Sequence, residues 1–489
     1  MIKAKVIDIL KYLSVEEIKK FSDFLHSPYF NTKDSIVKLF EAYKEFYPDY
    51  DNNVLSKEYI FEKIYPEKKY NDEVFRNLNS DLFLAAKNFL SVNNFYSDEF
   101  NLKKHLLFEL NRKKLTSLFD KCFDETKTII ENYSHRDTRY FFDAFTLYCE
   151  KSTNNSSKIK FSNEDIEESE LNFIRFFIMI ILDFQTLTVY HKRMLELDFT
   201  SLLDDDDVDE IFKKFSKKLS NLPQLLIYYY TFKVEATYDL KYYKKLKKLL
   251  FEFGNLLEKD NLYNKFHTLQ HYIQKTKPPN DLETISELFE IRNEMLEKNI
   301  FPDNFFSHTI FYNQVKSGIL LHKYDWAENF IKNYSHIIFS DYRESTINLS
   351  LALLCFWKKE YEQSLSHLAE VKYKDNFYIL QIKNITSYIY YEKNDFPALI
   401  NLLNSYKMYI IKNKELLESE FIYHNLFINF LNKLIKIKEH QKYHKLHKLL
   451  EEVTKCEFRG KIWMLEKIKE LEEKEKRSFK TKLGFKLNE

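Results

Sequence analysis

The sequence predicts an all-α protein, and three observations lead to that fold class. Gly occurs four times and Pro eight times in 489 residues, against usual frequencies of about 7% and 5%, which leaves little material for the tight turns of β-rich folds. Apolar residues recur three and four positions apart between residues that start or stop helices. A short signature also recurs every 35 residues, the length of one antiparallel helix pair. We therefore expect a helical-hairpin array (an α-solenoid) preceded by a compact N-terminal helical domain.

The first 97 residues show the clearest helix boundaries. Ser14 and Glu17 form a capping-box pattern ahead of apolar residues at helical spacing. Prolines then separate the following segments, and a polar residue able to cap a helix stands at the start of each; these residues are Pro28, Pro48 and Pro66, with Asn31, Ser56 and Asn71. Helices this short are unstable alone, so we expect them to share one core.

One turn in this region carries a family resemblance. The stretch FSDFLHSPYFN, residues 21–31, with Tyr65-Pro66 and Tyr70-Asn71 further on, resembles the start of a family of uncharacterised bacterial helical-repeat proteins. The Ser-Pro-Tyr-Phe-Asn turn is its most specific feature, and the resemblance brings no activity with it. We interpret the turn as a structural corner, in which Asn31 caps the next helix and two aromatics tuck between helices. An exposed recognition loop is the alternative.

The middle of the chain reads as further helices with two polar interruptions. The stretch 151–157, KSTNNSS, has no apolar periodicity and predicts a surface loop. A helix should follow from about 163 to 197. Asp204 to Asp207, with Asp209, form an acidic cluster that lacks the ligand spacing and mid-loop Gly of an EF-hand. We expect a solvated loop whose last acids cap the helix beginning near Val208.

The repeated signature reads Lys, any residue, an acid, then an aromatic. Its copies are Lys323-Tyr324-Asp325-Trp326, Lys358-Lys359-Glu360-Tyr361 and Lys393-Asn394-Asp395-Phe396. An apolar residue follows each aromatic by four positions and a small residue precedes it by nine: Phe330, Leu365 and Ile400, and Ser317, Ala352 and Ser387. Over about 304–412 this pattern resembles degenerate tetratricopeptide-type repeats. The resemblance implies a fold and no particular ligand.

These patterns divide the chain into three predicted parts. They are an N-terminal helical domain at 1–97, a region of diverged helix pairs at 98–300, and tetratricopeptide-like repeats at 301–489. Further helices are expected at about 415–437 and 440–452. The last, at about 459–476, has the one-sided apolar pattern of a capping helix. A basic, solvated and disordered tail should follow, with Lys474, Lys476, Arg477, Lys480, Lys482 and Lys486.

Two histidine groups have spacings that can serve metal binding. His440, His444 and His447 would share one helical face, with Cys456 nearby, and three histidines suit an open zinc site. No Glu lies within this triplet, and three lysines surround it. His267 and His271 form a second pair, four residues apart, without an acid at ligand spacing. We interpret both groups as solvent-facing or partly packed and assign no metal ligand.

Other chemistry is not indicated. Phosphate-cradling Gly loops, nucleophile elbows and paired-Cys motifs are absent from the sequence, so we predict no catalytic and no cofactor-binding residue. The four cysteines, Cys122, Cys149, Cys355 and Cys456, are far apart and suggest reduced thiols. The start lacks the pattern of a signal peptide, and the longest apolar run, 176–182, is much shorter than the roughly 20 residues of a membrane span. We expect a cytoplasmic protein without a membrane partner.

The leading hypothesis is a non-enzymatic protein–protein interaction scaffold whose partner is another protein or peptide, because stacked helix pairs form extended binding surfaces. The first alternative is a nucleic-acid-binding helical repeat, motivated by the basic tail and the signature lysines. The balance of 75 Lys and Arg against 74 Asp and Glu gives no overall attraction to nucleic acid. The second alternative is a metalloenzyme that uses His440, His444 and His447.

Overall fold

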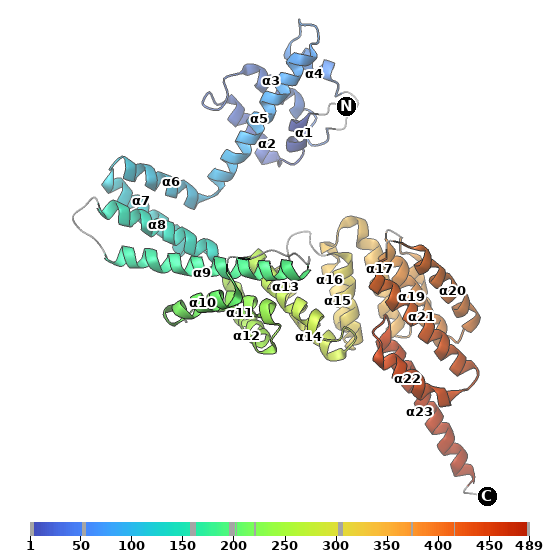
Figure 1. The fold of residues 1–489 in the computed structure, drawn as a ribbon. Coiled ribbons are helices and arrows are strands. Elements are labelled where there is room, and N and C mark those ends of the chain that lie inside the picture. The colour runs from blue at the N-terminus through green and yellow to red at the C-terminus, as the bar shows by residue number, and fades with distance from the viewer. Residues whose placement is uncertain are drawn as a thin grey trace. The chain divides into compact units, whose positions relative to one another are not determined.

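The structure, a computed structural model, describes residues 4–50, 55–156, 163–194, 201, 203–219, 222–301, 307–372, 375–414 and 416–486 (Figure 1). Across these ranges every regular element is a helix, which confirms the all-α class. The chain forms two compact units. The first comprises Met1–Tyr133 and Tyr140–Phe173, and the second comprises Ser134–Arg139 and Ile174–Glu489.

The first unit begins with five helices around a common core. Its helices are α1 (Lys5–Leu10), α2 (Val15–His26), α3 (Asp34–Lys44), α4 (Lys57–Ile64), α5 (Asp72–Ser97), α6 (Glu99–Arg112), α7 (Thr116–Glu131) and α8 (Thr138–Ser156). Buried aromatics from α2, α3 and α5 meet in the core of α1–α5: the rings of Phe21 and Phe40 lie 4.9 Å apart, and those of Phe21 and Phe89 lie 5.1 Å apart. A shared core explains how such short helices are stable.

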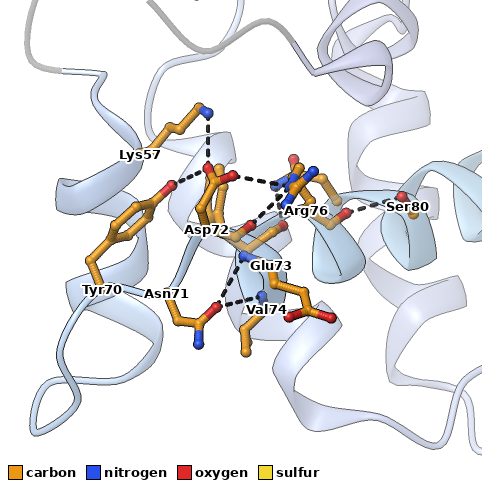
Figure 2. A network of polar contacts seen from close by, with 10 residues as sticks. Lys57, Tyr70, Asn71, Asp72, Glu73, Val74, Arg76 and Ser80 are labelled. Carbon is orange, nitrogen blue, oxygen red and sulfur yellow. Dashed lines mark hydrogen bonds and ion pairs between the residues drawn. The ribbon is translucent and has the colours of Figure 1, made fainter.

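The predicted caps at Ser14, Ser56 and Asn71 are confirmed. Ser14 and Glu17 form the reciprocal capping box. At the start of α5, the Asn71 side chain accepts hydrogen bonds from the Glu73 and Val74 amides at 3.0 and 3.2 Å (Figure 2). Asp72 beside it receives the Tyr70 hydroxyl at 2.7 Å and pairs with Lys57 at 3.1 Å. These contacts, the Tyr70 hydrogen bond first, lower the pKa of Asp72.

The turn after α2 differs from the prediction in two respects. Asn31 does not begin α3, whose N-cap is Lys33. Instead, its amide donates to the Leu25 carbonyl at 2.9 Å, so it satisfies a free carbonyl at the end of α2. The two aromatics are both exposed, Tyr29 by 88% and Phe30 by 42%, although Phe30 stacks on Phe24 with centroids 4.3 Å apart.

The loop predicted at 151–157 is also wrong over the residues that the structure describes, because α8 continues to Ser156. The polar side chains in this stretch suit a helix. Lys151 pairs with Asp120 at 3.0 Å and covers the Phe123 ring at 4.5 Å. The Ser152 hydroxyl donates to the Tyr148 carbonyl one turn earlier, at 2.9 Å, so a helical position leaves it satisfied.

The second unit contains the remaining helices. They are α10 (Asp205–Leu219), α11 (Pro223–Thr237), α12 (Leu240–Phe253), α13 (Lys259–Thr276), α14 (Leu282–Glu297), α15 (His308–Leu320), α16 (Tyr324–Tyr334), α17 (Ser340–Trp357), α18 (Tyr361–Ala369), α19 (Asn376–Glu392), α20 (Phe396–Lys412), α21 (Glu418–Glu439), α22 (Leu446–Lys455) and α23 (Lys461–Lys486). Helix α9 (Asn163–Met194) begins in the first unit and continues into the second. Consecutive helices pack together from α11 to α23, around a continuous buried core from α15 onward.

The signature marks three turns of the same geometry. A left-handed residue, His322, Lys359 or Asn394, ends the first helix of each pair. The next residue then donates its amide to the carbonyl five positions back, at 2.8 to 2.9 Å: Lys323 to Gly318, Glu360 to Cys355 and Asp395 to Tyr390. The second helices begin at Tyr324, Tyr361 and Phe396. The predicted register of the first copy is therefore wrong by two residues, because Tyr324, not Trp326, is equivalent to Tyr361 and Phe396.

This shift explains the other signature columns. Ala352 and Ser387 are fully buried, as expected of close helix contacts, but Ser317 is partly exposed. Gly318 is the residue that permits contact in the first pair, because a Cβ there would lie 2.8 Å from the Trp326 ring. The prediction that the residue four positions after each aromatic points inward is wrong for Ile400, which is exposed.

Candidate functional site

A groove on the second unit is lined by α9, α11 and α13. It encloses about 610 Å³. Apolar and aromatic side chains and paired charges both line it: Ile180, Asp183, Phe184, Thr186, Leu187, Tyr190, Thr231, Glu235, Tyr263, Asn264, Lys265, His267 and Thr268. A mixture of apolar walls and a few buried polar groups is typical of binding sites.

Helix α9 carries apolar residues on two faces. One face, with Ile178, Met179 and Leu182, is buried in the unit. The other is a row of exposed side chains, with 41, 43, 65 and 50% of the surface open at Phe177, Ile180, Phe184 and Leu187. Helices that are apolar all round are normally covered on every side. We call these four residues the α9 row.

By length and composition, Asn163–Arg193 is also the single candidate membrane span that the described residues contain, with a mean hydropathy of 1.6. Buried helices of globular proteins have the same composition. Polar side chains of α9 have protein partners. Asp183 binds Lys265, and the buried Gln185 side chain donates a hydrogen bond from Nε2 to the Ser201 hydroxyl at 3.2 Å.

Lys265 and Asp183 form an ion pair at the base of the groove. The Lys265 side chain is almost fully buried, and its ammonium lies 4.1 Å from the centre of the Tyr228 ring. Burial lowers the pKa of Lys265, and the charge of Asp183 partly opposes that effect. Asp183 remains half-exposed to water, so one partner of the pair is buried and the other lies at the surface of the groove.

A second buried pair lies where α11 and α13 meet. His271 Nδ1 lies 3.1 and 3.2 Å from the two carboxylate oxygens of Glu235, and both side chains are buried. The Tyr190 ring packs edge-on against His271 at 5.3 Å. Arg193 donates to the backbone carbonyls of Glu235 and Ala236, which ties the end of α9 to the end of α11.

Sequence reasoning proposed His267 and His271 but missed their acid. Glu235 lies 36 residues before His271 on another helix, and no local pattern connects them. The α9 row has a heptad-like spacing in the sequence; Phe177 and Ile180 lie inside the apolar run at 176–182, and Phe184 and Leu187 follow it. Sequence reasoning compared that run only with the length of a membrane span and did not identify an exposed row.

The metal-site geometry considered for His440, His444 and His447 is wrong. Helix α21 ends at Glu439, Gln441 has a positive φ, and α22 begins only at Leu446. The three histidines therefore lie on a helix cap, a 3₁₀ turn and a new helix, and they share no helical face. Cys456 is a free thiol. Among the residues that the structure describes, no group of three or more His, Cys, Asp or Glu side chains is placed to hold a metal ion.

The acidic cluster caps the N-terminus of its helix with its first residue and not with its last. Helix α10 begins at Asp205, and the first acid, Asp204, accepts hydrogen bonds from the Asp206 and Asp207 amides at 2.9 Å. The prediction that the last acids cap the helix is thus wrong. Asp209 instead pairs with the largely buried Lys233 at 2.8 Å.

The C-terminal tail is helical rather than disordered, because α23 continues to Lys486. The side chains of Lys480, Lys482 and Lys486 lie outside the described residues. The signature lysines, the other motive for nucleic-acid binding, bind within the protein. Lys358 pairs with Glu328 at 2.7 Å and Lys393 with Glu362 at 2.6 Å, each on the preceding second helix. Lys323 lies over the Phe289 ring at 4.6 Å.

Comparison of the chain with protein-family models, curated proteins and solved structures finds no match. Function therefore has to be inferred from geometry. The groove presents apolar side chains and satisfied charges, which suits binding of a second molecule.

Proposed function

We propose that the chain is a non-enzymatic protein-interaction scaffold, and that the groove docks an amphipathic helix of another protein. One observation carries this proposal: the exposed α9 row, of which Ile180, Phe184 and Leu187 line the groove. Its members, Phe177, Ile180, Phe184 and Leu187, are separated by three, four and three positions. That spacing forms a seam nearly parallel to the helix axis, which a second helix can follow by knobs-into-holes packing.

The magnitude of the apolar surface supports a stable contact. Full burial of a Leu, Ile or Phe side chain contributes about 1.5–3 kcal/mol, and about half of each side chain in the row is still open. Four such residues offer roughly 3–6 kcal/mol before the cost of association is subtracted. This is sufficient for a reversible contact when flanking polar groups add specificity.

The polar groups of the groove favour a protein helix over lipid. Asp183 and Glu235 are charged groups paired to Lys265 and His271 beside the row. Covering half-exposed Asp183 with hydrocarbon would remove its water without supplying a hydrogen-bond donor, which is costly. A helix with apolar residues on one face and polar residues at its edge can cover the row and hydrogen-bond to Asp183.

The wider architecture of this proposal is a tetratricopeptide-type array of helical hairpins in the C-terminal part. Three identical turns and the successive packing of α15 to α20 support it. Free cysteines, two of them buried, support a reducing cytoplasmic location.

Affinity capture from the native host, with variants as probes, tests the proposal. Phe184→Glu places a charge in the centre of the row, and Ile411→Glu makes the same change at an exposed residue of α20, which is 52% open. We expect one protein to be captured by the wild type and by Ile411→Glu but lost with Phe184→Glu. That protein, purified, should bind the wild type at least tenfold more tightly than Phe184→Glu, and a peptide of its amphipathic helix should compete.

Two results would overturn the proposal. In the first, every protein captured by the wild type is also captured by Phe184→Glu. In the second, the wild type binds lipid vesicles in a manner lost in Phe184→Glu while no protein partner depends on the row. Far-ultraviolet circular dichroism of each variant verifies that it is folded.

A further inference from the structure

Helix α12 carries an exposed ridge of four lysines, Lys241, Lys244, Lys245 and Lys248. Their positions i, i+3, i+4 and i+7 place them along one helical face. None of the four forms an ion pair with a carboxylate among the described residues. We call these four residues the α12 ridge.

The ridge contrasts with the charge pattern around it. On the same helix, Lys247 pairs with Glu290 at 2.7 Å, and Lys277 at the end of α13 pairs with Glu287 at 2.6 Å. The whole chain has 75 Lys and Arg against 74 Asp and Glu. A local concentration of unpaired positive charge is therefore a property of this surface and not of the composition.

The arrangement is unfavourable for the isolated helix. Like charges three and four positions apart destabilise a helix by about 0.2–0.5 kcal/mol per pair. Lys241 also lies in the first turn, where the helix dipole disfavours cations. An anionic partner that bridges the lysines removes both penalties, so the ridge is suited to a ligand with several regularly spaced negative charges.

Two tyrosine rings lie beside the ridge. The Lys245 ammonium is 5.1 Å from the centre of the Tyr230 ring, and that of Lys241 is 5.6 Å from the Tyr242 ring. The two rings are stacked, with centroids 6.1 Å apart, and both are partly open to solvent. On the other side, Lys244 and Lys248 border a groove of about 920 Å³ between α12 and α14.

We propose that the α12 ridge binds the phosphate backbone of a single-stranded nucleic acid. Lysines in a line beside partly exposed aromatic rings combine backbone neutralisation with surfaces on which bases can stack. The ridge spans about 10 Å at the helical rise of roughly 1.5 Å per residue, so a few consecutive phosphates can reach it.

Two other anionic partners fit the surface less well. A membrane-binding helix needs a broad apolar face beside its lysines, whereas Leu240 is the exposed large apolar residue of α12 among those that the structure describes. An acidic protein segment would meet Glu252 and Glu283, which line the neighbouring groove without an ion pair among the described residues. A nucleic acid can follow the ridge and the tyrosines on the side away from those acids.

Fluorescence anisotropy with the full chain and a labelled single-stranded 20-mer, as RNA and as DNA, tests the proposal. With four phosphate contacts, the affinity for a single strand should fall roughly 50-fold between about 50 and 200 mM salt. The double variant Lys241→Ala/Lys245→Ala should bind more weakly, and the slope of log K against log salt should fall by about 1.4. The matched control Lys407→Ala/Lys412→Ala removes two exposed lysines of α20 and should change neither value.

The proposal is overturned if the wild type does not bind at about 50 mM salt, the range where phosphate contacts are strong, or if the ridge variant and the control bind alike. It is also overturned if removing residues 474–489 abolishes binding while the ridge variant retains it. Binding of an acidic peptide or anionic vesicles through the ridge, without oligonucleotide binding, assigns the ridge to a different partner. Phe184→Glu should leave oligonucleotide binding unchanged, so failure here is distinguishable from failure of the docking proposal.

Discussion

The ion pair between Asp183 and Lys265 gives an asymmetric prediction for stability. Removing the acid with Asp183→Asn leaves a buried ammonium without its counter-charge. Loss of one partner of a buried pair costs about 3–5 kcal/mol. Because Asp183 is half-open to water, screening already weakens the pair, and we expect a value near the lower limit, about 3 kcal/mol.

Removing the base should have a smaller effect. Lys265→Met retains an unbranched apolar side chain against the Tyr228 ring and leaves Asp183 able to reach water. Replacement of buried charge by apolar volume is often neutral or stabilising, so we expect a change of less than about 1 kcal/mol. The double variant should resemble Lys265→Met, because the stranded ammonium that destabilises Asp183→Asn is gone.

Urea unfolding followed by tryptophan fluorescence measures these differences, because all three tryptophans, at positions 326, 357 and 463, lie in the second unit. The pH dependence provides an independent check. The folded-state pKa of Lys265 is lowered, so between that value and the ordinary 10.5 the unfolded chain binds a proton that the folded chain does not. Stability should therefore rise with pH in this window, relative to Lys265→Met. If Asp183→Asn and Lys265→Met unfold at the same urea concentration, the pair is not buried as described.

Three further predictions concern the C-terminal helices. Gly318→Ala should cost about 1–3 kcal/mol and shift tryptophan emission, because the new Cβ meets the Trp326 ring at 2.8 Å; an unshifted spectrum with unchanged stability would refute that contact. Tyr361→Ala should cost about 2 kcal/mol, because the Tyr361 ring is half-buried. The Glu360 side chain makes no cap hydrogen bond, so Glu360→Ala should cost only about 0.3 kcal/mol. Equal unfolding midpoints for the two variants would contradict the assigned turn. The pKa of Glu420 is lowered to about 2, first by its hydrogen bond to a buried histidine. Glu420 therefore stabilises the fold at pH values above its ordinary pKa of 4.5, and this contribution is lost as pH falls toward 2. Glu420→Gln should make the free energy of unfolding depend less on pH in that range, and an unchanged acid profile would exclude this role.

The sequence predicted those features of the fold that depend on neighbouring residues. Low Gly content and apolar periodicity indicated the all-α class, and the Ser14, Ser56 and Asn71 caps were identified because each cap bonds within three residues. Asn31 was misassigned for a related reason. A residue between two helices can satisfy the end of one or the start of the other, and the sequence does not distinguish these roles.

The candidate sites were harder to predict because their parts come from different helices. Asp183 and Lys265 are separated by 82 positions, and Glu235 and His271 by 36. Conversely, His440, His444 and His447 had suitable spacing only for an unbroken helix. The left-handed Gln441 between them ends that helix, although Gln is not a residue that usually signals a break.

The signature itself indicates where binding surfaces should be sought. The acid of the signature, or Lys323 in the first copy, donates the amide hydrogen bond that closes the turn between the two helices of a pair. The signature lysines pair with the preceding second helix in two copies, and the signature aromatics are half-buried between helices. Each repeated position therefore stabilises the stacking of one helix pair on the next. Side chains committed to stacking are not available to a ligand, so recognition must use residues that the period does not repeat. The α9 row and the α12 ridge both precede the first copy of the signature and consist of such residues. The α9 row offers exposed apolar surface, and the α12 ridge offers lysines that form no ion pair among the described residues.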